Sequence, residues 1–466
     1  MLGYAGSSIA VEEPNSASSL WTETAMTLVI VLQFVVVLAA IWMGARYSGV
    51  GLGLWGAVGL LVLVVAFGVN PTSPPIDVML IILAVIMAAS VMDAAGGIDF
   101  LVRIAEQIIR ANPKYVTIVA PLTTWAFTFL AGTGHIVYPL LPVIYETAHQ
   151  NGIRPERPMA VATIASQQAI TASPVAAATA ALIGLFAEKG ATQWGLPQIL
   201  MICVPATLAG VTAAAIVSMF VGADLENDPA YQARLAAGDV PPPTAAAARP
   251  LLKPAAKTSA LLFLVGVTLV VLFGFFPGLR TLPGEERALQ MPIVIEIVMM
   301  SIAAVMLLAT KVPVQEIPHT PTLHAGVVAV IGIFGLAWLG DSFIAANQDV
   351  IVPAIGAQAD AHPWTFAFGL FFASVLLYSQ AATTRALMPL GIALGIPPQF
   401  LIAMFPSVNG YFFIPTYGSL IAAINFDLSG TTKIGKYVIN HSFMIPGIVA
   451  TAVAVTTGLL LARIMF

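Results

Sequence analysis

Charged residues are scarce in this chain of 466 residues. Aspartate, glutamate, lysine and arginine together make up 9% of the sequence, whereas 59% of its residues are hydrophobic and its mean hydropathy is +0.94. A soluble domain carries about 25% charged residues, so this chain lacks the charge that covers a globular surface. The formal net charge of −4 comes from few groups and indicates no nucleic-acid partner.

Cysteine and catalytic motifs are scarce as well. Cys203 is the sole cysteine in the sequence, which excludes an intramolecular disulfide and a cysteine-based metal site. The sequence also lacks a phosphate-binding loop, a zinc motif and the Ser/His/Asp spacing of a hydrolase. ATP-driven transport is therefore unsupported, no cofactor is expected, and the pattern does not indicate an enzyme.

Apolar runs of membrane-spanning length dominate what is present. About 20 apolar residues cross a bilayer as a helix, and helices are forced because no water in the bilayer core pairs with an open backbone. We therefore expect an all-α polytopic protein of the inner membrane. Residues 1–24 are polar and acidic and lack the features of a secretory signal, so they are predicted to form an extracytoplasmic tail.

Glycine, proline and charged clusters divide the chain into two similar halves, residues 25–221 and 258–466, joined by a polar cytoplasmic linker, residues 222–257. Each half is predicted to contain three spans, an interrupted segment, an interrupted span and a plain span. The expected segments of the first half lie near 25–45, 49–69, 76–96, 115–149, 158–187 and 196–221, with an amphipathic stretch at 100–110. Those of the second half lie near 258–277, 291–310, 323–344, 363–396, 398–427 and 437–464, with a polar stretch from 345 to 362.

The predicted topology follows from the first interrupted segment of each half. If that segment is a re-entrant hairpin, each half has five transmembrane helices, and an odd number inverts the second half relative to the first. Two inverted repeats with broken helices at the substrate site are typical of secondary transporters. The basic residues agree, since one side receives most of them and becomes the cytoplasm, which places both termini outside. With Arg385 inside the membrane, the opposite side receives only Lys189, Arg280, Arg287 and Arg463.

Two polar breaks inside apolar segments are candidate substrate-binding tips. Irregular backbone at membrane depth is tolerated only where protein or a water-filled cavity surrounds it. The first break is therefore predicted to present amides and hydroxyls to a substrate carboxylate, and the alternative is close helix packing by small residues. The first break contains Gly132, Thr133, Gly134 and His135, and the second, at 379–385, contributes Gln380, Thr383, Thr384 and Arg385.

Arg385 is the basic residue within these apolar segments. An intramembrane arginine is costly unless it is paired, so it is a functional candidate by default. Its guanidinium matches a carboxylate in a bidentate manner, which predicts contact with a dianionic substrate. The alternative is an internal salt bridge, for which the sequence offers Asp341, Asp427 and Glu296.

The two interrupted spans supply the remaining candidates. Proline removes a backbone donor and disrupts the preceding turn, so half-helix ends are expected at Pro174 and Pro415. A half-helix N-terminus offers free N–H groups and a positive dipole to an anion. Breaks at matching places in both halves favour a binding site over incidental kinks. The candidates are Gln167 and Ser173 in the first half, and Asn409, Thr416 and Tyr417 in the second.

The motifs resemble the Dcu family of anaerobic C4-dicarboxylate transporters over residues 25–466. The resemblance implies uptake or exchange of fumarate, succinate, malate and aspartate, typically during fumarate respiration. It also implies kinship with the ion-transporter superfamily, whose members are homodimers with paired hairpins and elevator-like transport domains. The likeness is carried by residues 112–116, 132–135, 151–158, 172–175, 379–382, 415–417, 429–435 and 438–443.

Two alternatives remain open at this point. An ion or proton antiporter of the same architecture is expected to bury carboxylates at mid-membrane, whereas the acidic residues here lie mostly toward span ends. The second alternative is a transporter-like sensor partner that reports substrate to a signalling protein such as a sensor kinase, with linker 222–257 as its docking surface.

Overall fold

The computed structural model describes residues 16–47, 49–240, 251–285, 287–377, 379–415, 417–435 and 440–466. Within these ranges the regular elements are helices, apart from two isolated β-bridges. Six helical segments of the described chain are long and apolar enough to span a bilayer, and four shorter helices are also apolar. The prediction of an all-α polytopic membrane protein is therefore confirmed. The six segments are Ile76–Ala94, Leu196–Ser218, Ala256–Phe275, Met291–Thr310, Pro321–Val350 and Met444–Met465.

The interrupted segments of the first half break where the sequence predicted. A hairpin formed by α5 and α6 turns at residues 132–136, and the following span is broken between α7 and α8. The start of the first helix differs from the prediction. Helix α1 begins at Ser16, within the predicted tail, and not near residue 25. The first-half helices are α1 (Ser16–Tyr47), α2 (Gly51–Phe67), α3 (Ile76–Ala94), α4 (Gly97–Ala111), α5 (Val116–Ala131), α6 (Val137–Gln150), α7 (Glu156–Gln168), α8 (Ala177–Glu188) and α9 (Leu196–Ser218).

The second half repeats the hairpin and the broken span, with two departures from the prediction. The polar stretch after residue 344 is helical, since α14 continues to Ala361, and a π-helical turn at Ile333–Ala337 joins α13 to α14. The last helix begins at Met444 rather than near 437. The helices are α11 (Ala256–Phe275), α12 (Met291–Thr310), α13 (Pro321–Gly332), α14 (Trp338–Ala361), α15 (Phe366–Leu377), α16 (Gln380–Ala393), α17 (Pro398–Met404), α18 (Gly418–Phe426) and α19 (Met444–Met465).

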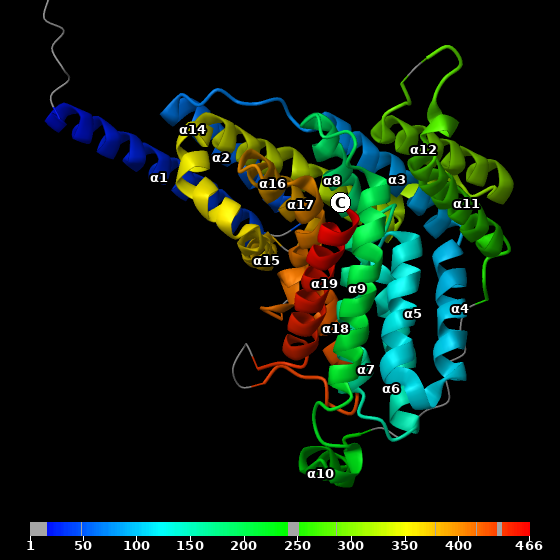
Figure 1. Ribbon diagram of the computed structural model, residues 1–466. Helices are drawn as coiled ribbons and strands as arrows, with labels where there is room; N and C mark the ends of the chain where they lie inside the picture. Colours follow the sequence, from blue (N-terminus) through cyan, green and yellow to red (C-terminus); the bar gives the residue numbers. More distant parts are fainter. Residues whose placement is uncertain are drawn as a thin grey trace, which may run out of the picture.

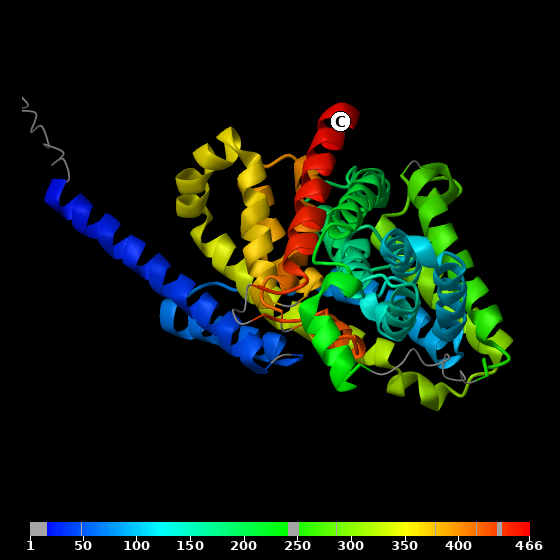
Figure 2. The ribbon, with the colours of Figure 1, turned by 90° about the horizontal axis from the view of Figure 1, so that it is seen from below.

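Helices α9 and α19 lie side by side through the centre of the molecule, and α1 and α12 lie toward opposite ends (Figure 1). Seen from below, α1 extends away from the body (Figure 2). A Cβ atom built at Gly210 of α9 would lie 2.3 Å from the carbonyl oxygen of Ala450 in α19. Such small residues let membrane helices approach closely, so this pair forms a tightly packed centre.

The two hairpins pack on the two broken spans in a reciprocal way. The first arms, α5 and α15, pack on the broken span of their own half, at α7 and at residues 405–412 respectively. The second arms cross over, since α6 packs on α18 and α16 packs on α8. This exchange brings the breaks of both halves, far apart in the sequence, to one place.

The described part of the linker is attached to the body. Helix α10 (Pro229–Ala237) follows Asp228, whose carboxylate pairs with the buried guanidinium of Arg154. Burial alone would raise the pKa of Asp228, but hydrogen bonds from Arg154 and from two backbone N–H groups outweigh it and lower that pKa. Arg154 also donates to Glu156 at 2.6 Å, and Glu156 accepts from the hydroxyl of Ser442 at 2.6 Å. The linker is therefore tied to segments from both halves.

Candidate functional site

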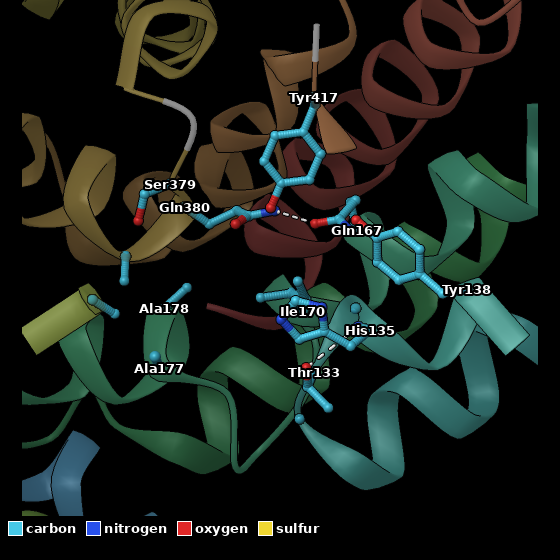
Figure 3. Close-up of a pocket in the computed structure, with 14 residues that line it drawn as sticks. Thr133, His135, Tyr138, Gln167, Ile170, Ala177, Ala178, Ser379, Gln380 and Tyr417 are labelled. Atoms are coloured by element: carbon cyan, nitrogen blue, oxygen red, sulfur yellow. Dashed lines mark hydrogen bonds between the residues drawn. The ribbon is translucent and has the colours of Figure 1, made fainter. Parts of the chain in front are cut away.

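A cavity of 140 Å³ lies where the two hairpins meet the two broken spans (Figure 3). A neighbouring cavity of 640 Å³ shares His135, Ala329, Ser379, Gln380 and Tyr417 with it. Together they provide room for a small molecule; we refer to the smaller one as the central cavity. Its lining comprises Gly132, Thr133, Gly134, His135, Tyr138, Gln167, Ile170, Ala177, Ala178, Ala329, Ser379, Gln380, Ala381 and Tyr417.

The tip of the first hairpin requires glycine at two positions. Gly132 ends α5 with a φ of 71°, a left-handed conformation that favours glycine, and its added Cβ would lie 2.6 Å from the carbonyl oxygen of Val175. A Cβ at Gly134 would lie 2.4 Å from Nε2 of Gln167. Thr133 accepts a hydrogen bond from the backbone N–H of His135 at 3.3 Å. The tip thus brings its backbone close to the first broken span.

Helix N-termini converge on the two cavities. Ser379 caps α16 by accepting from the backbone N–H of Ala382 at 3.2 Å, and Gln380 in the first turn faces the central cavity. The first residues of α8, Ala177 and Ala178, line the same cavity, and Gly418 at the start of α18 lines the neighbouring one. Because a helix N-terminus carries unpaired N–H groups and a partial positive charge, this arrangement favours an anion.

A chain of buried amides connects the wall of the central cavity to the core. Gln380 donates from Nε2 to Oε1 of Gln167 at 2.8 Å and to Oδ1 of Asn409 at 3.2 Å. Asn409 donates to Gln168 at 3.3 Å, and Gln168 donates to the hydroxyl of Thr451 at 2.9 Å. Figure 3 shows Gln167 and Gln380 facing each other beside Tyr417. Asn409 therefore lies behind the cavity, where it holds Gln380 in place.

The central cavity contains no fixed charge among its described lining residues. None of them is an aspartate, glutamate, lysine or arginine, and its titratable side chains are His135, Tyr138 and Tyr417. An anion in this cavity would meet backbone N–H groups, amides and hydroxyls rather than a permanent cation. The cavity thus offers an anion helix N-termini and neutral hydrogen-bond donors, whereas the sequence analysis predicted an arginine.

Arg385, which the sequence analysis placed in contact with substrate, is not among the residues that line this cavity. Its side chain is 1% exposed, and its guanidinium donates to Glu188 at 2.9 Å and to Asp341 at 3.3 Å. Asp341 was among the internal partners that the sequence offered, but Glu188 was not. Asp427, another of those partners, instead accepts hydrogen bonds from the nearby loop, including the backbone N–H of Ser429 at 3.0 Å. The described conformation assigns Arg385 to an internal ion cluster.

Several other predicted residues support the site without lining it. Thr383 and Thr384 donate to backbone carbonyls of their own helix, at 2.8 and 2.7 Å. Ser173 donates to the carbonyl of Phe129 at 2.7 Å and so ties the break of the first span to α5. Thr416 lies outside the described residues. The structure therefore brings Gly132, Thr133, Gly134, His135, Gln167, Gln380 and Tyr417 to the central cavity.

The structure also adds lining residues that the sequence analysis did not select. Ser379 starts the second break and Tyr138 follows the first, so their place beside polar breaks was a usable signal. Ile170 and Ala177 flank the interruption of the first broken span. Ala329 comes from the apolar helix α13, where nothing in the sequence separates it from its neighbours.

Two hairpins and two broken spans that meet at a cavity in a polytopic helical protein define a membrane transporter rather than an enzyme. Residues 29–466 match the model of the family described as anaerobic C4-dicarboxylate membrane transporters. The chain belongs to this family, which confirms the resemblance seen in its motifs.

Relatives of known name agree with this assignment. The chain is 41% identical over 441 residues to the C4-dicarboxylate transporter DcuA of Wolinella succinogenes, covering 94% of this chain and 100% of that protein. It is 42% identical over 437 residues to DcuA of Escherichia coli K12, covering 94% and 100%. It is 38% identical over 437 residues to the anaerobic C4-dicarboxylate transporter DcuB of Escherichia coli O6:H1, covering 92% and 98%.

A solved structure shares the fold at low sequence identity. The crystal structure of the Alcanivorax borkumensis YdaH transporter, described as having an unusual topology, superposes with a TM-score of 0.52 and 14% identity. The match covers 88% of this chain and 89% of that one. The match shows that the two chains share an overall architecture.

Proposed function

We propose that this protein exchanges or takes up C4-dicarboxylates, such as fumarate, succinate, malate and aspartate, across the inner membrane. The observation that carries the proposal is the central cavity, where the N-termini of α8 and α16 converge beside Gln167 and Gln380. Family membership supplies the substrate class. The absence of carboxylates among the described lining residues favours an anion over the cation of an ion antiporter.

The paired amides suggest how a carboxylate is accepted. In the described conformation Gln380 donates to Gln167, so the two amides pair with each other. On binding, Gln380 exchanges this neutral hydrogen bond for a charge-assisted bond to the substrate, which is roughly twice as strong. The first-hairpin tip, with Thr133, lies on the opposite wall and receives the other end of the dianion.

Alternating access by an elevator-like movement is part of the proposal. The reciprocal packing of α6 on α18 and of α16 on α8 agrees with two inverted repeats. Helices α1, α2 and α14 share a smaller hydrophobic cluster, which also takes in Leu377 and Ala382 of the second hairpin, beside the larger cluster, and this suits a scaffold that contacts that hairpin. Helix α10 and the C-terminus lie at opposite ends of α19 (Figure 1), in agreement with a cytoplasmic linker and an extracytoplasmic C-terminus. Dimerisation would occur through the scaffold.

Ligand-dependent thermal stability tests the substrate class. Succinate should raise the melting temperature of the purified protein more than butyrate does, because stabilisation follows affinity through mass action and the second carboxylate adds contacts. Unlabelled succinate should likewise drive the counterflow of labelled succinate in proteoliposomes more strongly than butyrate does. Equal stabilisation by the dicarboxylate and the monocarboxylate would contradict a dianion site. Gln380→Ala serves as the control that should lose the difference.

A further inference from the structure

Arg385, Glu188 and Asp341 form an ion cluster from three separate helices, in which Arg385 is buried, Asp341 is half-buried and Glu188 is exposed. The guanidinium on α16 reaches Glu188 at the end of α8 and Asp341 in α14, at 2.9 and 3.3 Å. One cation thus serves two carboxylates, and Nε of Arg385 and Oδ1 of Asp341 have no hydrogen-bond partner among the described residues. An ion cluster that is partly exposed and incompletely paired is a weak source of stability, so its arrangement suits contacts that form and break.

The cluster lies between cavities at the two ends of α16. The first residues of α16 line the central cavity, whereas Pro389, Ile392 and Ala393 line a third cavity of 620 Å³ near Glu188 and Asp341. The predicted topology places Lys189, which also lines the third cavity, on the extracytoplasmic side. It places Gly49, which lines the 640 Å³ cavity, on the cytoplasmic side. The ion cluster therefore belongs to the barrier between the central cavity and the outside.

The partners of Arg385 belong to different packing units. Phe186 of α8 is part of the larger hydrophobic cluster, whereas Leu339 and Phe343, on either side of Asp341 in α14, belong to the smaller one. Helix α16 lies at the boundary, because Met388 packs in the larger cluster and Ala382 in the smaller. The Arg385–Asp341 contact thus crosses the boundary between the two units.

We propose that Arg385, Asp341 and Glu188 form an extracytoplasmic latch that is closed in this conformation. The proposal rests on the alternating access proposed above and adds the element that holds one side shut. When the latch opens, α14 separates from α16 and Asp341 releases Arg385, while Glu188 keeps its contact. The guanidinium is then never left without a carboxylate, which would be strongly unfavourable. Opening connects the third cavity to Gln380 and so admits substrate from outside.

A disulfide between α14 and α16 tests whether these helices must separate. A Cβ built at Gly340 lies 3.6 Å from the carbonyl oxygen and 3.9 Å from the Cα atom of Ala386, so the two helices are in contact here and cysteines at these positions need only a small shift to form a disulfide. In a Cys203→Ser background, oxidation of the Gly340→Cys/Ala386→Cys protein should cross-link it and reduce succinate counterflow to the background level. Reductant should restore counterflow, and the two single-cysteine proteins should be indifferent to oxidant. Full transport by the cross-linked protein, or failure of the cysteines to cross-link, would overturn the latch.

The roles of the two carboxylates are distinguished by the initial rate of this cross-link in the absence of substrate. Asp341→Asn should slow cross-linking at least threefold, because the closed state loses its contact across the boundary. Glu188→Gln should leave the rate unchanged or increase it, because Arg385 then pairs with Asp341 alone. Glu146→Gln is the matched control, since Glu146 accepts from Arg110 at 2.7 Å in a pair remote from the cluster. Equal rates in all proteins, or equal slowing by both cluster variants, would contradict the proposal.

Cross-linking rates are independent of any substrate. If succinate is not transported but Asp341→Asn alone slows cross-linking, the substrate assignment fails and the latch stands. If succinate is transported and the rates do not respond to Asp341, the latch fails and the proposed function stands. The two proposals therefore fail separately.

Discussion

The two ends of α16 meet cavities of opposite character. At its N-terminus the central cavity is lined by helix ends, amides, hydroxyls and His135, without a carboxylate or a permanent cation among the described lining residues. Toward its C-terminus the third cavity is lined by Asp77, Glu188, Lys189 and Asp341, with Arg385 beside it. On the proposed function, intramembrane charge does not by itself mark the substrate site. In this protein, charge joins helices, whereas oriented neutral dipoles are suited to receive the anion.

The largest expected effect comes from removing Arg385, the cation beside the charged cavity toward the C-terminus of α16. Arg385→Leu removes the cation between Glu188 and Asp341 and leaves Lys189 as the neighbouring cation. Breaking a fully buried ion pair costs about 3–5 kcal/mol, and we expect a loss toward the lower end of this range because Glu188 is exposed. We expect a strong loss of folded protein, measured as the melting temperature and the yield of monodisperse protein in detergent. Neutralising both partners as well, with Glu188→Gln and Asp341→Asn, should restore most of the stability. A normally stable Arg385→Leu protein would show that the pairing is unimportant.

The contrast between the two ends also shows what sequence could predict. The breaks were predictable because they depend on local backbone chemistry: Gly132 adopts a positive φ, and Pro174 interrupts hydrogen bonding inside an apolar run. Gln167 and Gln380 were found because polar residues beside such breaks have few other roles in a membrane span. These signals require only neighbouring residues, so the position of the central cavity followed from them.

Other features depend on pairings between distant residues. Glu188 lies 197 positions from Arg385 in the chain, and nothing local to either residue indicates the contact. Asn409 and Gln168 are likewise 241 positions apart, so the support of Gln380 by buried amides appears only in the folded structure. The helical continuation of α14 to Ala361 was missed because the sequence pattern marks the end of an apolar run and not the end of a helix.

An intermediate effect is expected from adding a methyl group at Gly134, beside the uncharged central cavity. In Gly134→Ala the new Cβ would lie 2.4 Å from Nε2 of Gln167, so this amide must shift and its hydrogen bond with Gln380 is disturbed. Overpacking of this kind costs about 1–3 kcal/mol. We expect succinate affinity, measured by calorimetric titration, to fall by roughly tenfold at a cost near 1.4 kcal/mol. Gly369→Ala is the matched control, since its Cβ would have no neighbour within 4 Å. Unchanged affinity in Gly134→Ala would remove Gln167 from the site.

The smallest expected effect comes from two helix caps that differ in location. Ser379 accepts from the N–H of Ala382 at the start of α16, and Thr320 accepts from the N–H of Leu323 at the start of α13. Each →Ala substitution removes a cap worth about 0.5–2 kcal/mol, so both should lower the melting temperature by similar amounts. Ser379 also lines the central cavity, whereas Thr320 does not.

Only the cap at the cavity should affect binding. Without Ser379 the first turn of α16 frays, and Gln380 and the free N–H groups lose their fixed positions facing the substrate. A loss of about 1 kcal/mol corresponds to a roughly fivefold weaker succinate affinity, so Ser379→Ala should raise the Kd by that factor while Thr320→Ala leaves it unchanged. Titration of both proteins at one temperature, well below either melting point, separates binding from stability. Equal Kd values would mean that the N-terminus of α16 does not hold the anion, and this would contradict anion binding in the central cavity.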